Sequence, residues 1–190
     1  MAMGTGERLT DAAALLLDEG GEAAVTLRAV ALAVGVSHNA PYRHFADRSA
    51  LLAGVAERDL RVFTRLFESI SASDQPAIGK LAAALAEFVA YGEAHPARYR
   101  LLFSDPDIAS RGGSLEEAAM ETFAELAKLV GQAQAEGNLP SIPTLQLTGL
   151  IYATVHGLLD FQAGGRMKSE KGFTSVMDGV KTMLRLIAND

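Results

Sequence analysis

Histidine is the residue type here best suited to metal binding or acid–base catalysis, and the chain has four: His38, His44, His95 and His156. The nearest two lie six residues apart, so they do not share a helix face, and no Glu-x-x-His motif occurs. The absence of cysteine excludes thiolate metal sites and thiol nucleophiles. The chain also lacks a nucleophile elbow and a phosphate-binding glycine loop. The sequence therefore predicts a protein that is not an enzyme and that holds no metal and no cofactor.

A second set of polar residues, within 26–48, has the types that contact DNA. His38 and Asn39 stand in the first turn of a predicted short helix, where asparagine can pair with adenine and histidine with guanine. Ala40 offers a methyl group of the size that meets a thymine methyl. The same segment holds three arginines and one acid, Asp47, a net charge of +2. These features predict a small basic patch that reads base edges.

The charge of the whole chain limits how this patch can act. The 190 residues include 17 basic and 23 acidic side chains, a net charge of −6, which argues against DNA binding over the whole surface. A good base contact contributes only ~1–3 kcal/mol, so two or three of them cannot reach the ~10⁻⁸ M of specific regulators. Two-fold symmetry doubles the contacts. We therefore expect a homodimer on a double-stranded, palindromic DNA operator.

Apolar residues recur at helical spacing almost throughout, which predicts an all-α fold of about nine helices. A short helix starting after Thr26 is stopped by Gly35, and a third covers about 37–44. Asp47 caps a long fourth helix from Arg48 to about Ile70. Two short helices joined by a glycine turn are typical of a helix-turn-helix, the alternative being a helical corner in an ordinary bundle. We expect a DNA-binding domain at 1–46 and a ligand-binding and dimerisation domain at 47–190.

The second half is predicted to be helical with several breaks. A fifth helix runs from Pro76 to about Gly92, and His95 leaves the helical region because a proline follows it. Further helices are expected at 97–103, 115–133, 144–163 and 173–187. The stretch 104–114, with its proline and paired glycines, reads as a surface loop.

The N-terminal motif resembles that of the tetracycline-repressor (TetR/AcrR) family of transcriptional regulators over about residues 7–56. The segments that carry the resemblance are TLR at 26–28, AVG at 33–35, VSHNAPYRHF at 36–45, DR at 47–48 and LL at 51–52. The stretch 95–103 and the VHG at 155–157 are similar to a subgroup whose C-terminal domain carries a Trp-His-Gly signature. Val155 stands here in place of the tryptophan.

The resemblance implies which side chains meet DNA. Tyr42 and His44 would hydrogen-bond phosphates. Thr26 and Arg28 would do so from the second helix. Arg48 would do so from the start of the fourth, where the helix dipole adds attraction. The predicted DNA-contacting set is Thr26, Arg28, Ser37, His38, Asn39, Ala40, Tyr42, His44 and Arg48.

Pro41 departs from a regular helix at this place. If Ser37 caps the third helix, residue 41 should return the first bond to its carbonyl, and proline has no N–H to do so. We expect a tightened or 3₁₀-like start that changes where His38 and Asn39 point. The alternative is that Pro41 only stiffens the segment.

Two C-terminal helices are predicted to form the dimer contact. The helix at 144–163 is apolar nearly all round, with Asp160 as its only charge, and such a helix usually has a partner on its outer face. The segment 173–188 adds a second apolar face. Pairing with their symmetry mates would give a four-helix bundle, as the family resemblance also implies. Alternatively, both helices are satisfied within one chain.

The aromatic residues point to an effector site or to plain core. In the family, the middle helices enclose a largely apolar pocket. A small apolar or amphipathic effector bound there would release DNA by shifting a conformational equilibrium, with the long fourth helix as the lever. The predicted lining is Phe88, Tyr91, Tyr99, Phe123, Tyr152 and His156. His156 fits a satisfied core or interface histidine equally well.

Nothing in the sequence indicates a membrane or an exported protein. No targeting segment is recognised, and the most apolar window, 145–161, is too short and too polar to span a bilayer. We expect a cytoplasmic protein. The rival interpretation of the whole chain is a helical protein-interaction module that has lost operator binding.

Overall fold

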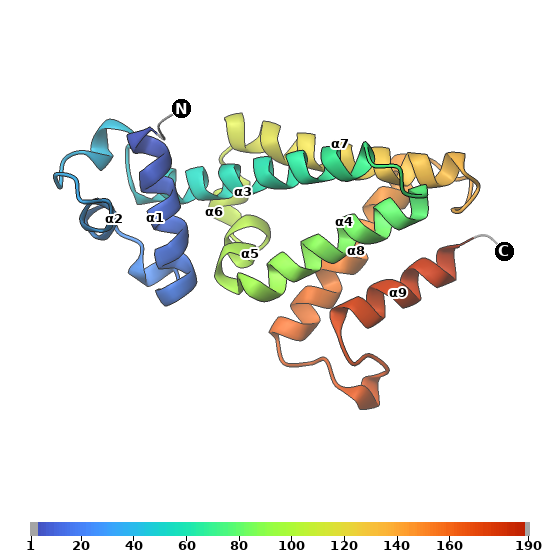
Figure 1. Ribbon diagram of the computed structural model, residues 1–190. Helices are drawn as coiled ribbons and strands as arrows, with labels where there is room; N and C mark the ends of the chain where they lie inside the picture. Colours follow the sequence, from blue (N-terminus) through green and yellow to red (C-terminus); the bar gives the residue numbers. More distant parts are fainter. Residues whose placement is uncertain (1–3, 189–190) are drawn as a thin grey trace. The chain divides into compact units, whose positions relative to one another are not determined.

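The computed structural model describes residues 4–188, and all regular structure among them is helical. This confirms the predicted all-α class with about nine helices (Figure 1). The elements are α1 (Thr5–Gly20), η1 (Glu22–Ala24), α2 (Leu27–Val34), η2 (Pro41–Arg43), α3 (Arg48–Ser71), α4 (Ala77–Ala94), α5 (Pro96–Phe103), α6 (Pro106–Ala109), α7 (Gly113–Ala135), α8 (Thr144–Ala163), η3 (Ser169–Lys171) and α9 (Val176–Ile187), where η denotes 3₁₀ helix.

These helices pack into two compact units. The first comprises the described residues up to Val62 together with His95–Ala119, and the second comprises Phe63–Ala94 and the residues from Met120 onward. The helices α3 and α7 each contribute to both units. The predicted boundary between residues 46 and 47 stays a prediction about function, because packing divides the chain along different lines.

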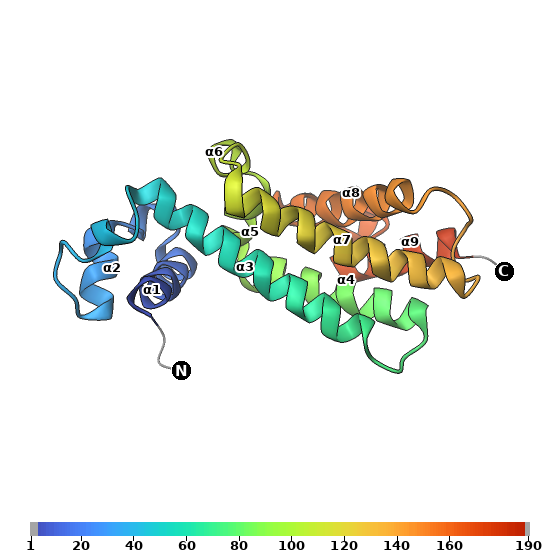
Figure 2. The same cartoon turned by 90° about the horizontal axis from the view of Figure 1, so that it is seen from above.

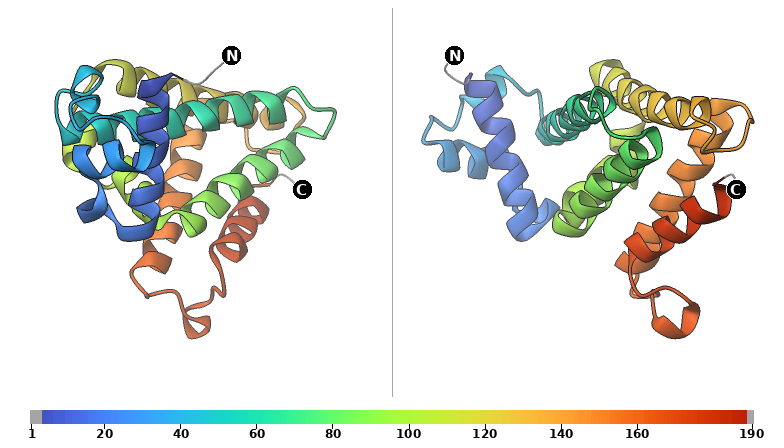
Figure 3. Two further views of the ribbon diagram at one scale, coloured as in Figure 1. Left: turned by 60° about the vertical axis from the view of Figure 1, so that its left-hand side comes forward. Right: turned by 45° about the vertical axis from the view of Figure 1, so that its right-hand side comes forward.

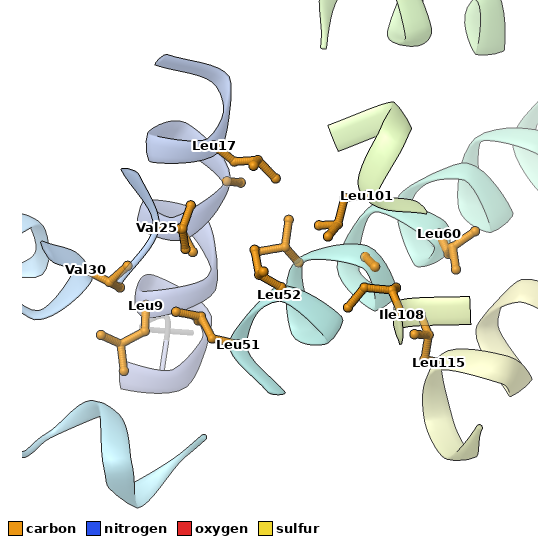
Figure 4. Close-up of a cluster of buried hydrophobic side chains, with 14 of the residues drawn as sticks. Leu9, Leu17, Val25, Val30, Leu51, Leu52, Leu60, Leu101, Ile108 and Leu115 are labelled. Atoms are coloured by element: carbon orange, nitrogen blue, oxygen red, sulfur yellow. The ribbon is translucent and has the colours of Figure 1, made fainter. Parts of the chain in front are cut away.

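The first unit has one apolar core to which α1, α2, α3, α5, α6 and the start of α7 all contribute. Figure 4 shows Leu9 and Leu17 of α1 beside Leu51 and Leu52 of α3, with Leu101 of α5 on the same cluster. Leu9, Leu17, Leu51 and Leu101 are fully buried. The N-terminal helices therefore share their core with helices more than forty residues later in the sequence.

A cluster of charged side chains also ties α1, α3 and α5 together in this unit. Arg98 donates to both carboxylate oxygens of Asp18, over 3.0 Å from Nε and 2.8 Å from Nη2. Its Nη1 lies 3.2 Å from Asp59 Oδ2. Asp59 is only 4% exposed and pairs at 3.2 Å with Arg58, which lies 2.8 Å from Asp11. The cluster fixes α5 against α1 and α3.

In the second unit, α4, α8 and α9 contact one another pairwise (Figure 2). Their inward faces carry the residues that helical spacing predicted, such as Leu81 and Leu85 of α4, Ile151 and Val155 of α8, and Val180 of α9, all of them buried. The segment joining α8 to α9 contains η3 and extends away from the two helices (Figure 3).

Local signals explain most of the helix boundaries. His95 has φ −128° and ψ 59°, outside the helical region, which confirms the break predicted from the proline that follows it. The expected surface loop at 104–114 is wrong in part, because α6 forms there. Asp105 caps α6 by accepting from the N–H groups of Asp107 and Ile108, and Pro106 suits the first helical position.

Among residues 4–188, no helix is both long and apolar enough to cross a membrane.

Candidate nucleic-acid interface

The helix α2 is bounded by the two signals that its sequence predicted. Thr26 has an extended backbone, and its Oγ1 accepts from the Ala29 N–H at 3.0 Å, so it caps the helix. Gly35 ends the helix with φ 74° and ψ 33°, the left-handed conformation that glycine adopts without strain. The Val36 N–H then reaches the Ala31 carbonyl at 3.0 Å, as in a Schellman motif. The chain consequently turns sharply before residue 37.

The segment after this turn is not the regular α-helix that the spacing predicted over 37–44. It forms turns and the 3₁₀ helix η2, with the Ala40 N–H bonded to the Ser37 carbonyl at 2.9 Å. Pro41 explains the difference, because it has no N–H to return an α-helical bond to Ser37. The His44 N–H bonds to the Pro41 carbonyl at 2.9 Å. The predicted 3₁₀-like geometry is confirmed, and η2 is the third helix of the module.

Side-chain packing holds η2 in place from both neighbouring helices. Pro41 is buried, and Phe45 packs against the core of the first unit. A Cβ added at Gly54 of α3 would lie 3.1 Å from the Phe45 ring, so glycine permits this close approach. One added at Gly6 of α1 would lie 3.3 Å from His44 Nδ1. The turns of this segment are therefore fixed by contacts outside it.

Most of the predicted DNA-contacting residues are exposed. Thr26, Arg28, Ser37, His38, Asn39, Tyr42 and His44 are exposed, while Ala40 and Arg48 are half-buried. A hollow of about 400 Å³ in the surface is lined by Thr26, Arg28 and His38, together with other residues of α2 and Val36. The structure thus brings residues of α2 and of the following turn to one concave surface. That these side chains contact DNA stays a prediction.

Arg48 lies differently from the other predicted residues. Its Nε donates to the Val25 carbonyl at 2.7 Å, and its Nη2 donates to the Glu22 carbonyl. The Glu22 carboxylate is 3.5 Å from Nη2. The guanidinium is thus directed at η1 and the residue before Thr26. Its assignment as a phosphate contact stays a prediction.

Two residues of this surface were missed by sequence reasoning. Leu32 lines the hollow and is 82% exposed. It follows Arg28 by four residues, and this spacing places both on one face of α2. Arg43 is exposed in η2, next to Tyr42. Its positive charge was counted in the patch, but the residue was not named as a contact.

Five of the six predicted effector-binding residues belong to the second unit, where ring contacts connect them. Phe88 of α4 lies 5.1 Å from the His156 ring of α8, and Tyr152 lies 4.1 Å from the same ring. Phe123 of α7 is 5.8 Å from Tyr152. Phe63 of α3 joins Phe88 at 5.3 Å to Tyr91 at 4.9 Å. We call these six residues, Phe63, Phe88, Tyr91, Phe123, Tyr152 and His156, the aromatic cluster.

The sixth predicted residue, Tyr99, lies in the first unit. It is buried and packs at 5.2 Å against Phe103 of its own helix. Within the aromatic cluster, burial lowers the pKa of His156 from 6.5 to about 4 and raises the pKa of Tyr152. His156 is therefore a neutral side chain at pH 7.

Family comparisons agree with this architecture. The family described as "Bacterial regulatory proteins, tetR family" matches residues 9–55. The family described as "Tetracyclin repressor-like, C-terminal domain" matches residues 81–185, which is more than half of the chain. A search of curated proteins finds no match.

Solved structures share the fold over nearly the whole chain. A protein of unknown function from Rhodococcus sp. RHA1 is 26% identical, with a TM-score of 0.79, and the match covers 99% of this chain and 97% of that one. SmeT, the repressor of the Stenotrophomonas maltophilia multidrug efflux pump SmeDEF, is 20% identical, with a TM-score of 0.70 and coverages of 99% and 92%. Reduced NemR from E. coli is 15% identical, with a TM-score of 0.74 and coverages of 97% and 97%. The last two show likeness of fold.

A helix-turn-helix module and a matching helical C-terminal domain define a DNA-binding transcriptional regulator. The chain belongs to the TetR family of bacterial regulatory proteins. Members of this family bind DNA and catalyse no reaction, so family membership confirms that the protein is not an enzyme.

Replacing His156 by phenylalanine should make the protein less sensitive to acid. Because burial lowers the pKa of His156 from 6.5 to about 4, the unfolded chain binds more protons than the folded one between these values. The wild type should therefore lose on the order of 3 kcal/mol of unfolding free energy, through this group, as the pH falls across that range. His156→Phe should not lose it. Urea unfolding of both proteins at about pH 7 and about pH 4.5 measures the difference, and parallel pH profiles would contradict the assignment.

Proposed function

We propose that this protein is a cytoplasmic repressor of transcription that binds a palindromic operator as a homodimer and is released by a small apolar or amphipathic effector. DNA binding is assigned to residues 1–46, and effector binding and dimerisation to 47–190. The observation that most supports the proposal is the exposed polar surface formed by α2 and the turn after it, in a chain of the TetR family.

The chemistry of that surface suits DNA. His38 and Asn39 carry side chains that can read base edges, and both are exposed in the turns before η2. Ala40 beside them is small enough to meet a thymine methyl. Phosphate contacts are assigned to exposed side chains on both sides of these readers. The proposed contacts are Thr26, Arg28, Ser37, His38, Asn39, Ala40, Tyr42 and His44.

Selection of binding sites from random DNA duplexes by the purified protein tests this function. We expect one palindromic sequence to be enriched, because two recognition surfaces related by symmetry read inverted half-sites. Enrichment of no sequence would favour a helical protein-interaction module without operator binding. Tight binding to one asymmetric site would contradict the symmetric dimer.

The double variant His38→Ala, Asn39→Ala should lose specific binding to the selected operator. Each residue is assigned one base contact per half-site worth ~1–3 kcal/mol, so the dimer should lose affinity on the order of 10³-fold or more. Fluorescence anisotropy at fixed salt measures the operator and a scrambled duplex in parallel. Binding to the scrambled duplex should change little. Glu116→Ala with Glu117→Ala, an exposed pair on α7, is the control; equal operator affinities for the two double variants would refute the assignment.

Dimerisation through α8 and α9 is supported by apolar side chains that the single chain leaves exposed. Leu145 and Leu150 of α8 are 67% and 58% exposed, and Leu186 of α9 is 80% exposed. On α8, a Cβ placed at Gly149 or Gly157 would meet open space. An apolar surface of this kind marks a protein-protein contact, and a symmetric contact uses the same surface twice.

The double variant Leu150→Glu, Leu186→Glu should sediment as a monomer, because a dimer would bury unpaired carboxylates at considerable cost. Its operator affinity should fall with the dimer. The control is Met120→Glu on α7, where the methionine is 63% exposed and lies outside α8 and α9. Sedimentation equilibrium measures both variants, and a dimeric Leu150→Glu, Leu186→Glu protein would place the contact elsewhere.

Effector binding is assigned to the second unit because the aromatic cluster draws on four helices, α3, α4, α7 and α8. Tyr152 is 38% exposed, whereas Phe88 is 8% exposed, so the cluster extends from the surface into the interior. A neutral His156 suits an apolar ligand because it presents no charge at pH 7. Tyr99 remains part of the proposed lining.

Compounds that enter the aromatic cluster should weaken operator binding by about 5–150-fold, the range of a typical allosteric coupling. The probe is the fluorescent dye anilinonaphthalene sulfonate, whose displacement identifies compounds that bind. Tyr152→Ala should reduce dye binding, whereas Met120→Ala should not. Anisotropy then measures operator affinity with each displacing compound. Unchanged affinity with all of them would contradict effector control.

A further inference from the structure

The helix α2 depends on contacts from other elements for its position. It has only eight residues, and helices of this length are marginal in water without packing. Leu27, Val30 and Ala31 are buried, while Arg28, Leu32 and Ala33 face solvent. Apolar contact on one side fixes the depth of a helix better than its position along its own axis. Directional contacts at its two ends supply that second restraint.

At the N-terminal end, the contact comes from Arg48 at the start of α3. Its Nε bonds to the Val25 carbonyl at 2.7 Å, and its Nη2 bonds to the Glu22 carbonyl. Val25 is fully buried and immediately precedes Thr26, the cap of α2. Two donors of one planar guanidinium therefore hold the backbone from which α2 starts.

At the C-terminal end, the contact comes from Arg8 of α1. Its Nη2 donates to the Val34 carbonyl at 2.9 Å. Val34 is the last residue of α2, where helical carbonyls have no partner within the helix. A cation is also favoured there by the negative end of the helix dipole. Arg8 thus bonds to the backbone immediately before the Gly35 turn.

We infer that Arg8 and Arg48 are positioning residues for DNA binding: they hold α2 at its two ends through backbone carbonyls, so that Arg28 and the turn carrying His38 keep one fixed arrangement. Arg48 acts through α2 and not as a phosphate ligand. The inference rests on the proposed DNA binding. It divides the arginines of the module into Arg8 and Arg48, which bond to the protein backbone, and Arg28 and Arg43, which are exposed to DNA.

The salt dependence of operator binding separates the two roles of Arg48. A phosphate ligand releases counterions, so its loss lowers the slope of log K against log salt by ~0.9 for each phosphate. We expect Arg48→Gln and Arg8→Gln each to weaken operator binding by about tenfold or more with an unchanged slope. Arg28→Gln, the reference variant for a phosphate contact, should reduce the slope.

A lysine substitution supplies the second criterion. Arg48→Lys keeps the charge, but its single ammonium cannot reproduce the two-donor geometry at Val25 and Glu22. We expect it to bind the operator as weakly as Arg48→Gln, with lower discrimination against a scrambled duplex. Recovery of affinity in Arg48→Lys, with a reduced slope in Arg48→Gln, would overturn the inference.

Amide hydrogen exchange tests the positioning without DNA. The amides of Leu27–Val34 should exchange faster in Arg8→Gln and in Arg48→Gln, while those of α8 and the urea midpoint stay unchanged. The control is Arg65→Gln, an exposed arginine seventeen residues after Arg48 on α3, which should leave both readouts as in the wild type. Faster exchange in a protein that selects no operator would preserve the positioning role and refute only the proposed function. Unchanged exchange in α2 would refute the positioning role.

Discussion

The burial of Asp59 is the constraint on which the first unit depends. A carboxylate that is 4% exposed requires cationic partners, and it has one from its own helix, Arg58, and one from α5, Arg98. Removing one partner of a buried pair leaves an uncompensated charge, which costs roughly 3–5 kcal/mol. The same Arg98 also binds Asp18 of α1 through two bonds. A helix from the middle of the chain is thereby held against the helices that carry the recognition surface, and the apolar core with Leu101 strengthens this connection.

This arrangement uses much of the positive charge of the first unit inside the protein. Arg58 and Arg98 neutralise buried or half-buried carboxylates, and Arg8 and Arg48 bond to backbone carbonyls. The surface that faces DNA in our proposal keeps Arg28 and Arg43 as its exposed arginines. On a chain of net charge −6, nonspecific attraction to DNA is therefore weak. Specific contacts and dimerisation must supply the affinity, which is why fixed positions for α2 and η2 matter.

Local signals let the sequence predict much of this fold. Thr26, Gly35 and Pro41 act through hydrogen bonds to residues within five positions, so their effects could be derived without tertiary structure. The Asp105–Pro106 pair is a signal of the same kind, and it was read only as part of a loop. Other features depend on partners distant in sequence. The contact of Arg48 with η1 and the place of Tyr99 in the first unit both follow from tertiary packing, which helical spacing does not encode.

The 3₁₀ turns of residues 37–44 have a consequence for how such a protein changes over generations. A reader built on a regular helix restricts its side chains to those that favour that helix. Here Pro41, Phe45 and the surrounding glycines fix the backbone, and Ser37, His38 and Asn39 carry little responsibility for folding. Exchanges at these three positions are therefore open to drift, and a duplicated copy can acquire a new target sequence while the scaffold beneath it stays intact.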